Sequence, residues 1–122
     1  MELESYKELR CSELIADKFY AHSQDQGLNY MKTIPVVSGA STDQGNVSYA
    51  LPSLHPGFLI DVKNPMIGPH HPLFEKSAGT RPAFEASLKY AKVMAATGLD
   101  ILLDAGLREQ LWAEHRETFG TQ

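Results

Sequence analysis

The chain has 122 residues, of which 43% are hydrophobic and 21% are charged, and its formal net charge is −4. These values are typical of one globular domain with one core. Lysine and arginine are scattered, which makes nucleic acid a poor partner. No run of about 18 apolar residues predicts a membrane helix, and the opening MELESYKELR lacks the apolar region of a signal peptide. We therefore expect a cytoplasmic protein without a membrane partner.

The first predicted element is a helix over about Leu3–Gln26, because its apolar residues recur at helical spacing. Gly27 is a suitable end, since glycine readily adopts the left-handed conformation. Cys11, the only cysteine, excludes an internal disulfide and a site with several thiolates. It lies at helical spacing from Ile15 and Phe19, so we expect it to be a small buried side chain rather than a nucleophile.

Three extended segments are predicted next. They are Thr33–Val37, Tyr49–Pro56 and Gly57–Val62, and a turn rich in hydroxyl groups separates the first from the second. Gly57–Val62 is a continuous apolar run with β-branched and aromatic members, which is typical of a strand buried on both faces.

Two helices are predicted in the C-terminal part of the chain. The first begins near Pro82, with Thr80 as its cap, and it places Phe84, Leu88, Ala91, Ala95, Leu99 and Leu102 on one face. The second spans about Ala105–Phe119, with Asp104 as its cap.

This order predicts an α/β fold with a partial three-layer sheet flanked by helices, in a single domain over residues 1–122. The sheet is expected to be incomplete, because an interior strand such as Gly57–Val62 requires neighbours on both sides.

The hydroxyl-rich turn is the first candidate site. Ser41, Thr42, Asp43 and Asn46 bring many donors and acceptors into a few residues. A turn of this kind can present backbone N–H groups to an anion. Its side chains can equally satisfy the turn's own backbone, and the residues alone leave both interpretations open.

The second candidate is the histidine pair His70 and His71, which lies between two prolines in the segment Asn64–Thr80. Neutral imidazole is a common zinc ligand and a common general base. A catalytic zinc site needs about three protein ligands, and the nearby Asp61 and Glu75 complete no known ligand spacing. An exposed loop with two histidines is the simpler alternative.

Several motifs in a fixed order resemble the C-terminal part of metallopeptidase family twenty, which includes aminoacylases, aminobenzoyl-glutamate hydrolases and dipeptidases. They are STDQGNVSYALPSLHPGFLI, HHPLFEKSAGT and AKVMAATGLDIL. The resemblance implies that His70 is a zinc ligand and that His71 fills the following substrate-side position, where relatives have threonine or serine. It also implies that Ser41, Thr42, Asp43 and Asn46 line the substrate side of the site.

Other motifs of the family do not occur in this chain. The family's His-x-Asp motif and its Glu-Glu pair with the general base are found nowhere in the sequence. No residue is therefore predicted to be catalytic. The chain is expected to be the C-terminal segment of a zinc-dependent amidohydrolase or peptidase that cleaves N-acyl amino acids or dipeptides. The N-terminal portion and the lid domain of that enzyme are expected to be absent, so we expect no activity in isolation.

Two alternatives remain open. The chain could be a free-standing, non-catalytic binding or dimerisation module derived from the family. It could also be a small hydrolase whose site forms between two copies from His55, His70, His71 and Asp43. The expected partner is accordingly either a second copy or a separate N-terminal chain.

Overall fold

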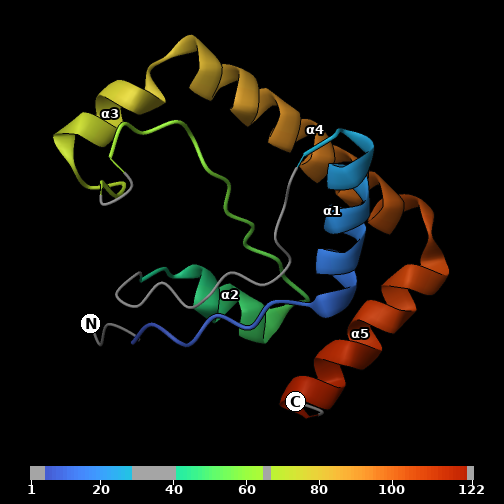
Figure 1. The fold of residues 1–122 in the computed structure, drawn as a ribbon. Helices are drawn as coiled ribbons and strands as arrows, with labels where there is room; N and C mark the ends of the chain where they lie inside the picture. The colour runs from blue at the N-terminus through green and yellow to red at the C-terminus, as the bar shows by residue number, and fades with distance from the viewer. Residues whose placement is uncertain (1–4, 29–40, 65–66, 121–122) are drawn as a thin grey trace.

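The computed structural model describes residues 5–28, 41–64 and 67–120 of the chain. Within these ranges the backbone forms helices only: α1 (Glu13–Asp25), α2 (Gln44–Ala50), α3 (Pro72–Ala78), α4 (Arg81–Leu103) and α5 (Ala105–Phe119). Figure 1 shows α1 beside α4 and α5, while α2 and α3 lie on opposite sides of the molecule. Among these described helices, none combines the length and the hydropathy that a membrane span requires.

The prediction of an α/β fold with a partial sheet is wrong for the described residues. Gly57–Val62 has no regular secondary structure, and the segment Tyr49–Pro56 begins as the end of α2 and then continues irregularly. The third predicted strand, Thr33–Val37, lies outside the described residues. A strand must bond its backbone N–H and C=O groups to a neighbouring strand, and the described part of the chain supplies no such neighbour. Gly57–Val62 is instead attached through Phe58, whose ring stacks on Tyr90 of α4 at 4.7 Å.

The first helix is shorter than predicted, because it begins at Glu13 instead of Leu3. Ser12 is its N-cap, and the Ser12 hydroxyl accepts a hydrogen bond from the backbone N–H of Ile15 at 3.2 Å. The described residues before Ser12 run outside the helix. The predicted end is confirmed, since Gly27 has a φ of +64° directly after the C-cap Gln26.

The core lies where α1 meets α4 and α5. Phe19 of α1 packs with Val93 of α4, and Ile15 packs with Leu107 and Leu111 of α5. Cys11, which was expected in this core, is exposed because it precedes the helix. The prediction for Cys11 is therefore wrong, and its cause is the misplaced helix start.

The predicted caps of the last two helices are confirmed. Thr80 accepts from the backbone N–H of Ala83 at 3.4 Å, and Asp104 accepts from that of Leu107 at 3.0 Å. Asp104 alone separates α4 from α5. These local bonds set the turn between the helices.

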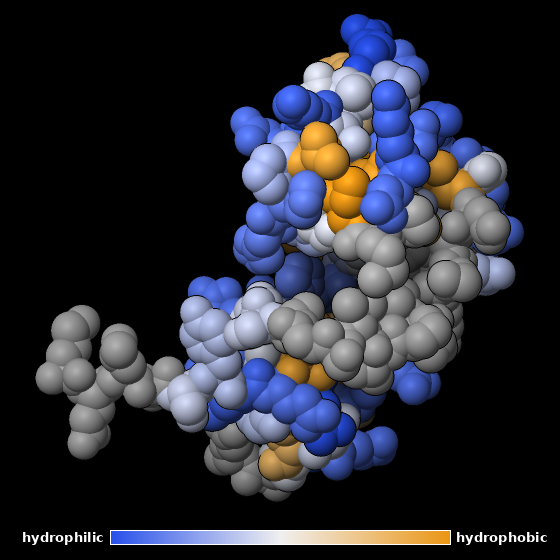
Figure 2. Space-filling view, turned by 60° about the vertical axis from the view of Figure 1, so that its left-hand side comes forward, coloured by the Kyte–Doolittle hydropathy of each residue, from blue (hydrophilic) through white to orange (hydrophobic). Residues whose placement is uncertain are grey.

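One apolar face of α4 remains open to solvent. Val93 and Thr97 are buried on the side that contacts α1. Phe84, Leu88, Leu99 and Leu102 are 50%, 47%, 53% and 74% exposed. Figure 2 shows orange side chains uncovered in the upper part of the molecule, the height at which Figure 1 draws α3 and α4. A helix that is apolar on two sides is typical of a position between two layers.

Candidate functional site

The predicted anion-binding turn leads into α2, and part of it bonds to the chain's own backbone. The Thr42 hydroxyl accepts from the backbone N–H of Gln44 at 3.2 Å. Ser41 and Asp43 are exposed, and the Asp43 side chain makes no capping bond to α2. The side chain of Thr42 thus closes the turn, as the simpler interpretation expects.

Asn46, the fourth residue of this candidate site, holds the segment that precedes α1. The backbone N–H of Lys7 donates to Oδ1 of Asn46 at 3.0 Å, and Nδ2 of Asn46 donates to the carbonyl of Ser5 at 3.4 Å. The backbone N–H of Arg10 donates to Oγ of Ser48 at 3.1 Å. Side chains of α2 therefore act as a template along which the segment lies.

Gly45 makes this approach possible. A Cβ atom on Gly45 would lie 1.9 Å from the carbonyl oxygen of Lys7, closer than any real carbon–oxygen contact. Only glycine leaves room for backbone at this position. In the resemblance Gly45 belongs to the substrate-side motif, and in this structure it also fits the chain's own N-terminal segment.

The histidine pair precedes α3. His71 is the N-cap of that helix, and its Nδ1 accepts from the backbone N–H of Leu73 at 3.1 Å, while Pro72 occupies the first helical position. Both His70 and His71 are exposed. The pair thus presents His70 to solvent next to a histidine that is engaged locally.

The structure does not bring the two predicted regions together. Figure 1 draws α2 at the opposite side of the molecule from α3, with the segment after α2 running between them. No group of three His, Cys, Asp or Glu side chains in the described residues is arranged to hold a metal ion. His70 alone does not fit a zinc site, which needs about three protein ligands.

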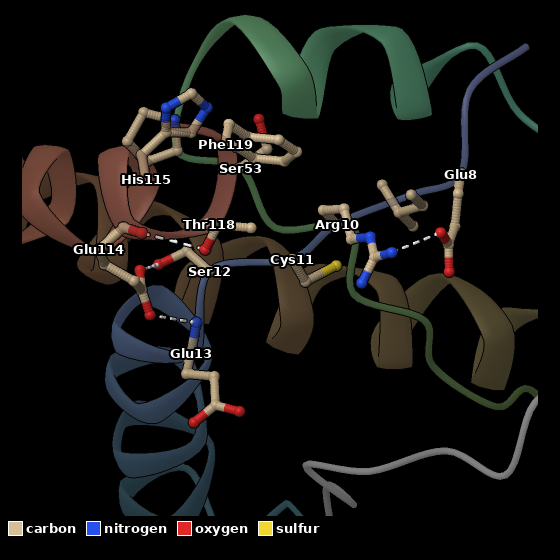
Figure 3. Close-up of a pocket in the computed structure, with 12 residues that line it drawn as sticks. Glu8, Arg10, Cys11, Ser12, Glu13, Ser53, Glu114, His115, Thr118 and Phe119 are labelled. Atoms are coloured by element: carbon tan, nitrogen blue, oxygen red, sulfur yellow. Dashed lines mark hydrogen bonds and ion pairs between the residues drawn. The ribbon is translucent and has the colours of Figure 1, made fainter. Parts of the chain in front are cut away.

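A polar cavity of about 530 Å³ lies where the N-terminal segment, α1 and α5 meet (Figure 3). Glu114 of α5 is its central group. The Glu114 carboxylate accepts from the Ser12 hydroxyl and from the backbone N–H groups of Glu13 and Leu14, the latter two at 2.8 and 3.2 Å. Both of its oxygens are thereby bonded to the start of α1, where a negative charge is favourable.

The other reactive groups around this cavity do not form a nucleophile–base pair. Nε2 of His115 donates to the carbonyl of Ser48 at 3.1 Å, and Figure 3 shows the Cys11 thiol away from His115. Arg10 pairs with Glu8 at 2.7 Å. We interpret the cavity as a structural junction whose polar groups bond to one another.

The roles of Glu114 and His115 were not predicted from the sequence. Each acts on a residue far away in the chain, Ser12 and Ser48 respectively. No local pattern indicates such a contact. The only signal was the position of Ser12 before Glu13 and an apolar run, which is a typical helix start.

No protein-family model matches the chain, and no solved structure gives a significant match. Curated proteins do match. The mouse (Mus musculus) protein named Xaa-Arg dipeptidase is 28% identical over 94% of this chain. The human (Homo sapiens) protein of the same name is 33% identical over 68% of it. One of the proteins that make up the p-aminobenzoyl-glutamate hydrolase of Escherichia coli K12 is 37% identical over 70% of it.

The matched regions are a minor part of these relatives. They cover 26%, 19% and 18% of the three proteins, in the same order. The chain therefore spans about a quarter or less of the length of the curated relatives that it matches. Their names support a relationship to peptidases and amidohydrolases.

Proposed function

We propose that this chain is the C-terminal segment of a metal-dependent amidohydrolase of metallopeptidase family twenty, and that it has no hydrolase activity by itself. The observation that carries the proposal is the match to three relatives named as a dipeptidase or a hydrolase, each over two thirds or more of this chain. The order of the sequence motifs supports the same relationship. In a complete enzyme of this kind, zinc would polarise the amide carbonyl and activate water.

Under this proposal His70 contributes one zinc ligand to the complete enzyme. His70 is exposed, so a ligand set from another segment or another chain can reach it. His71, held by its bond to Leu73, would set the position of its neighbour. Ser41 and Asp43 are exposed and would remain available to a substrate carboxylate or its solvent shell.

The exposed face of α4 supports placement of the chain in a larger assembly. The described core has seven buried hydrophobic residues, whereas fourteen large hydrophobic side chains are exposed. A stable monomer rarely exposes contiguous apolar surface of this kind.

A segment exchange tests the proposal. The matching region of the mouse Xaa-Arg dipeptidase is replaced by the corresponding residues of this chain, and hydrolysis of dipeptides with C-terminal arginine is measured together with zinc content. We expect the exchanged protein to hydrolyse the dipeptide, and His70→Ala to abolish hydrolysis and lower the zinc content. His22→Gln is the matched control, because His22 bonds to Asp100 at 2.9 Å on the other side of the fold.

The isolated chain is assayed in parallel. We expect no hydrolysis of the same dipeptides or of aminobenzoyl-glutamate with zinc added. Hydrolysis by the pure chain that disappears in His70→Ala would contradict the proposal, and so would an active exchanged protein that tolerates His70→Ala.

A further inference from the structure

The second apolar face of α4 is the surface with the most unexplained features. We define the α4 stripe as Phe84, Leu88, Ala91, Ala95, Leu99 and Leu102, which follow one another in steps of four, three, four, four and three residues. Every residue of the stripe is exposed. The steps are those of a helix-pairing seam, and the stripe extends for about 27 Å at 1.5 Å per residue.

The side chains that α4 uses inside the chain belong to another face. Ala83, Val93 and Thr97 are buried, and Tyr90 packs beside Phe19 and Val93. Because a helix turns by about 100° per residue, the α4 stripe lies roughly opposite these positions. Contacts within the described chain therefore leave the stripe free for an external partner.

We infer that the α4 stripe pairs with the α4 stripe of a second copy, with the two helices antiparallel about a two-fold axis near Val93. The order of side-chain sizes along the stripe supports this arrangement. Large residues stand at both ends, Phe84 and Leu88 at one and Leu99 and Leu102 at the other, with Ala91 and Ala95 between them. This order reads the same in both directions, as a self-complementary two-fold interface requires.

The antiparallel arrangement places alanine against alanine at the centre and large side chains against each other at both ends. Ala91 then faces Ala95 of the second copy, and Phe84 faces Leu102. Two helices approach closely where their contact residues are small, and the large side chains bury apolar area at either end. The same stripe in a parallel pair would stack Phe84 on itself and Lys92 beside Lys92.

The charges of α4 favour the same orientation. Its first half contains Arg81, Lys89 and Lys92 with a single acidic residue, Glu85. Residues 93–104 contain no lysine or arginine and have Asp100 and Asp104. An antiparallel pair brings Arg81 near Asp104 of the second copy, whereas a parallel pair brings the basic halves together. The helix dipoles also oppose each other favourably in the antiparallel pair.

Sedimentation equilibrium of the full 122-residue chain over a range of concentrations tests the inference. We expect a reversible dimer. Ala91→Glu places a charge at the centre of the interface and should raise the dimer dissociation constant at least about tenfold, since it buries an unpaired carboxylate. Ala21→Glu is the matched control, because Ala21 is an exposed alanine on α1, and the dissociation constant should not change.

A second pair of variants keeps the test valid if one variant is misfolded by circular dichroism. Leu102→Glu removes an exposed stripe residue and should weaken the dimer by a similar factor. Leu59→Glu alters the more exposed Leu59, which lies outside α4, and should have no effect on association.

Cross-linking then tests the orientation in a Cys11→Ser background. Phe84→Cys protein and Leu102→Cys protein are mixed and oxidised, and we expect the mixed 84–102 disulfide to dominate. A monomer at every concentration, a dimer that tolerates both Ala91→Glu and Leu102→Glu, or a dominant 84–84 cross-link would each overturn the inference. The inference does not depend on the proposed function, because His70 and the turn at Ser41 lie outside α4.

Discussion

Glu114 of α5 caps the start of α1 by accepting the hydroxyl of Ser12 as well as two backbone N–H groups of its first turn. Two helices that lie far apart in the chain are thus joined by one carboxylate. Charge-assisted bonds to a helix N-terminus are stronger than neutral ones.

This relationship predicts the effect of Glu114→Ala. The free energy of unfolding should fall by about 1–2 kcal/mol, because three hydrogen bonds at the N-terminus of α1 are lost. Urea denaturation followed by circular dichroism measures the change. Glu117→Ala is the control, since Glu117 is exposed on the same helix, and it should change stability by less than about 0.5 kcal/mol. Equal effects of the two variants would show that Glu114 is not a cap.

Gly45→Ala should detach the N-terminal segment from α2. The added Cβ would lie 1.9 Å from the Lys7 carbonyl oxygen, so the backbone must move and the bond between Lys7 and Asn46 must break. We expect faster tryptic cleavage after Lys7 and Arg10, and a loss of stability of about 1–3 kcal/mol. Gly68→Ala, where an added Cβ meets nothing within 4 Å, should leave both unchanged. A normal cleavage rate in Gly45→Ala would contradict the described contact.

Cys11 should react completely with a thiol reagent in the folded protein. Its exposed position before α1 predicts a rate close to that of the unfolded chain, within about tenfold, because access and thiolate fraction set the rate. Titration with and without denaturant measures it. A thiol that reacts only after unfolding would restore the original expectation of a buried cysteine.

His71→Ala should loosen the first turn of α3. The bond from the Leu73 N–H to Nδ1 of His71 would be lost, and caps of this kind contribute about 1 kcal/mol. Hydrogen exchange at the Leu73 amide should accelerate about fivefold, the factor that corresponds to this free energy. His71→Asn retains a capping oxygen and should exchange at nearly the original rate. The same rate in both variants would contradict a capping role.

The contrast between confirmed and wrong predictions has a physical cause. Thr80, Asp104 and Gly27 were predicted correctly because a cap acts on backbone within about three residues of itself. Gly57–Val62 was assigned to a sheet on its side chains alone, and a strand exists only beside another strand. Local chemistry can be predicted from the sequence, whereas pairing with a distant or external element cannot.

The same distinction applies to the candidate site. The turn at Thr42 could be recognised from composition, but the sequence did not show that Asn46 bonds to Lys7, 39 residues away. The start of α1 was misplaced because Ser12 depends on Glu114. The roles of His70 and His71 at a metal depend on ligands that the described residues do not assemble, so they remain predictions.

Zinc content of the purified, dialysed chain, beside His70→Ala, tests the central claim most directly. The claim is that His70 belongs to a metal site that this chain does not complete. We predict far less than one zinc per chain, with no difference between the original protein and His70→Ala. One zinc per chain that is lost in His70→Ala would contradict the claim, and it would show that a complete site forms within this chain or between its copies.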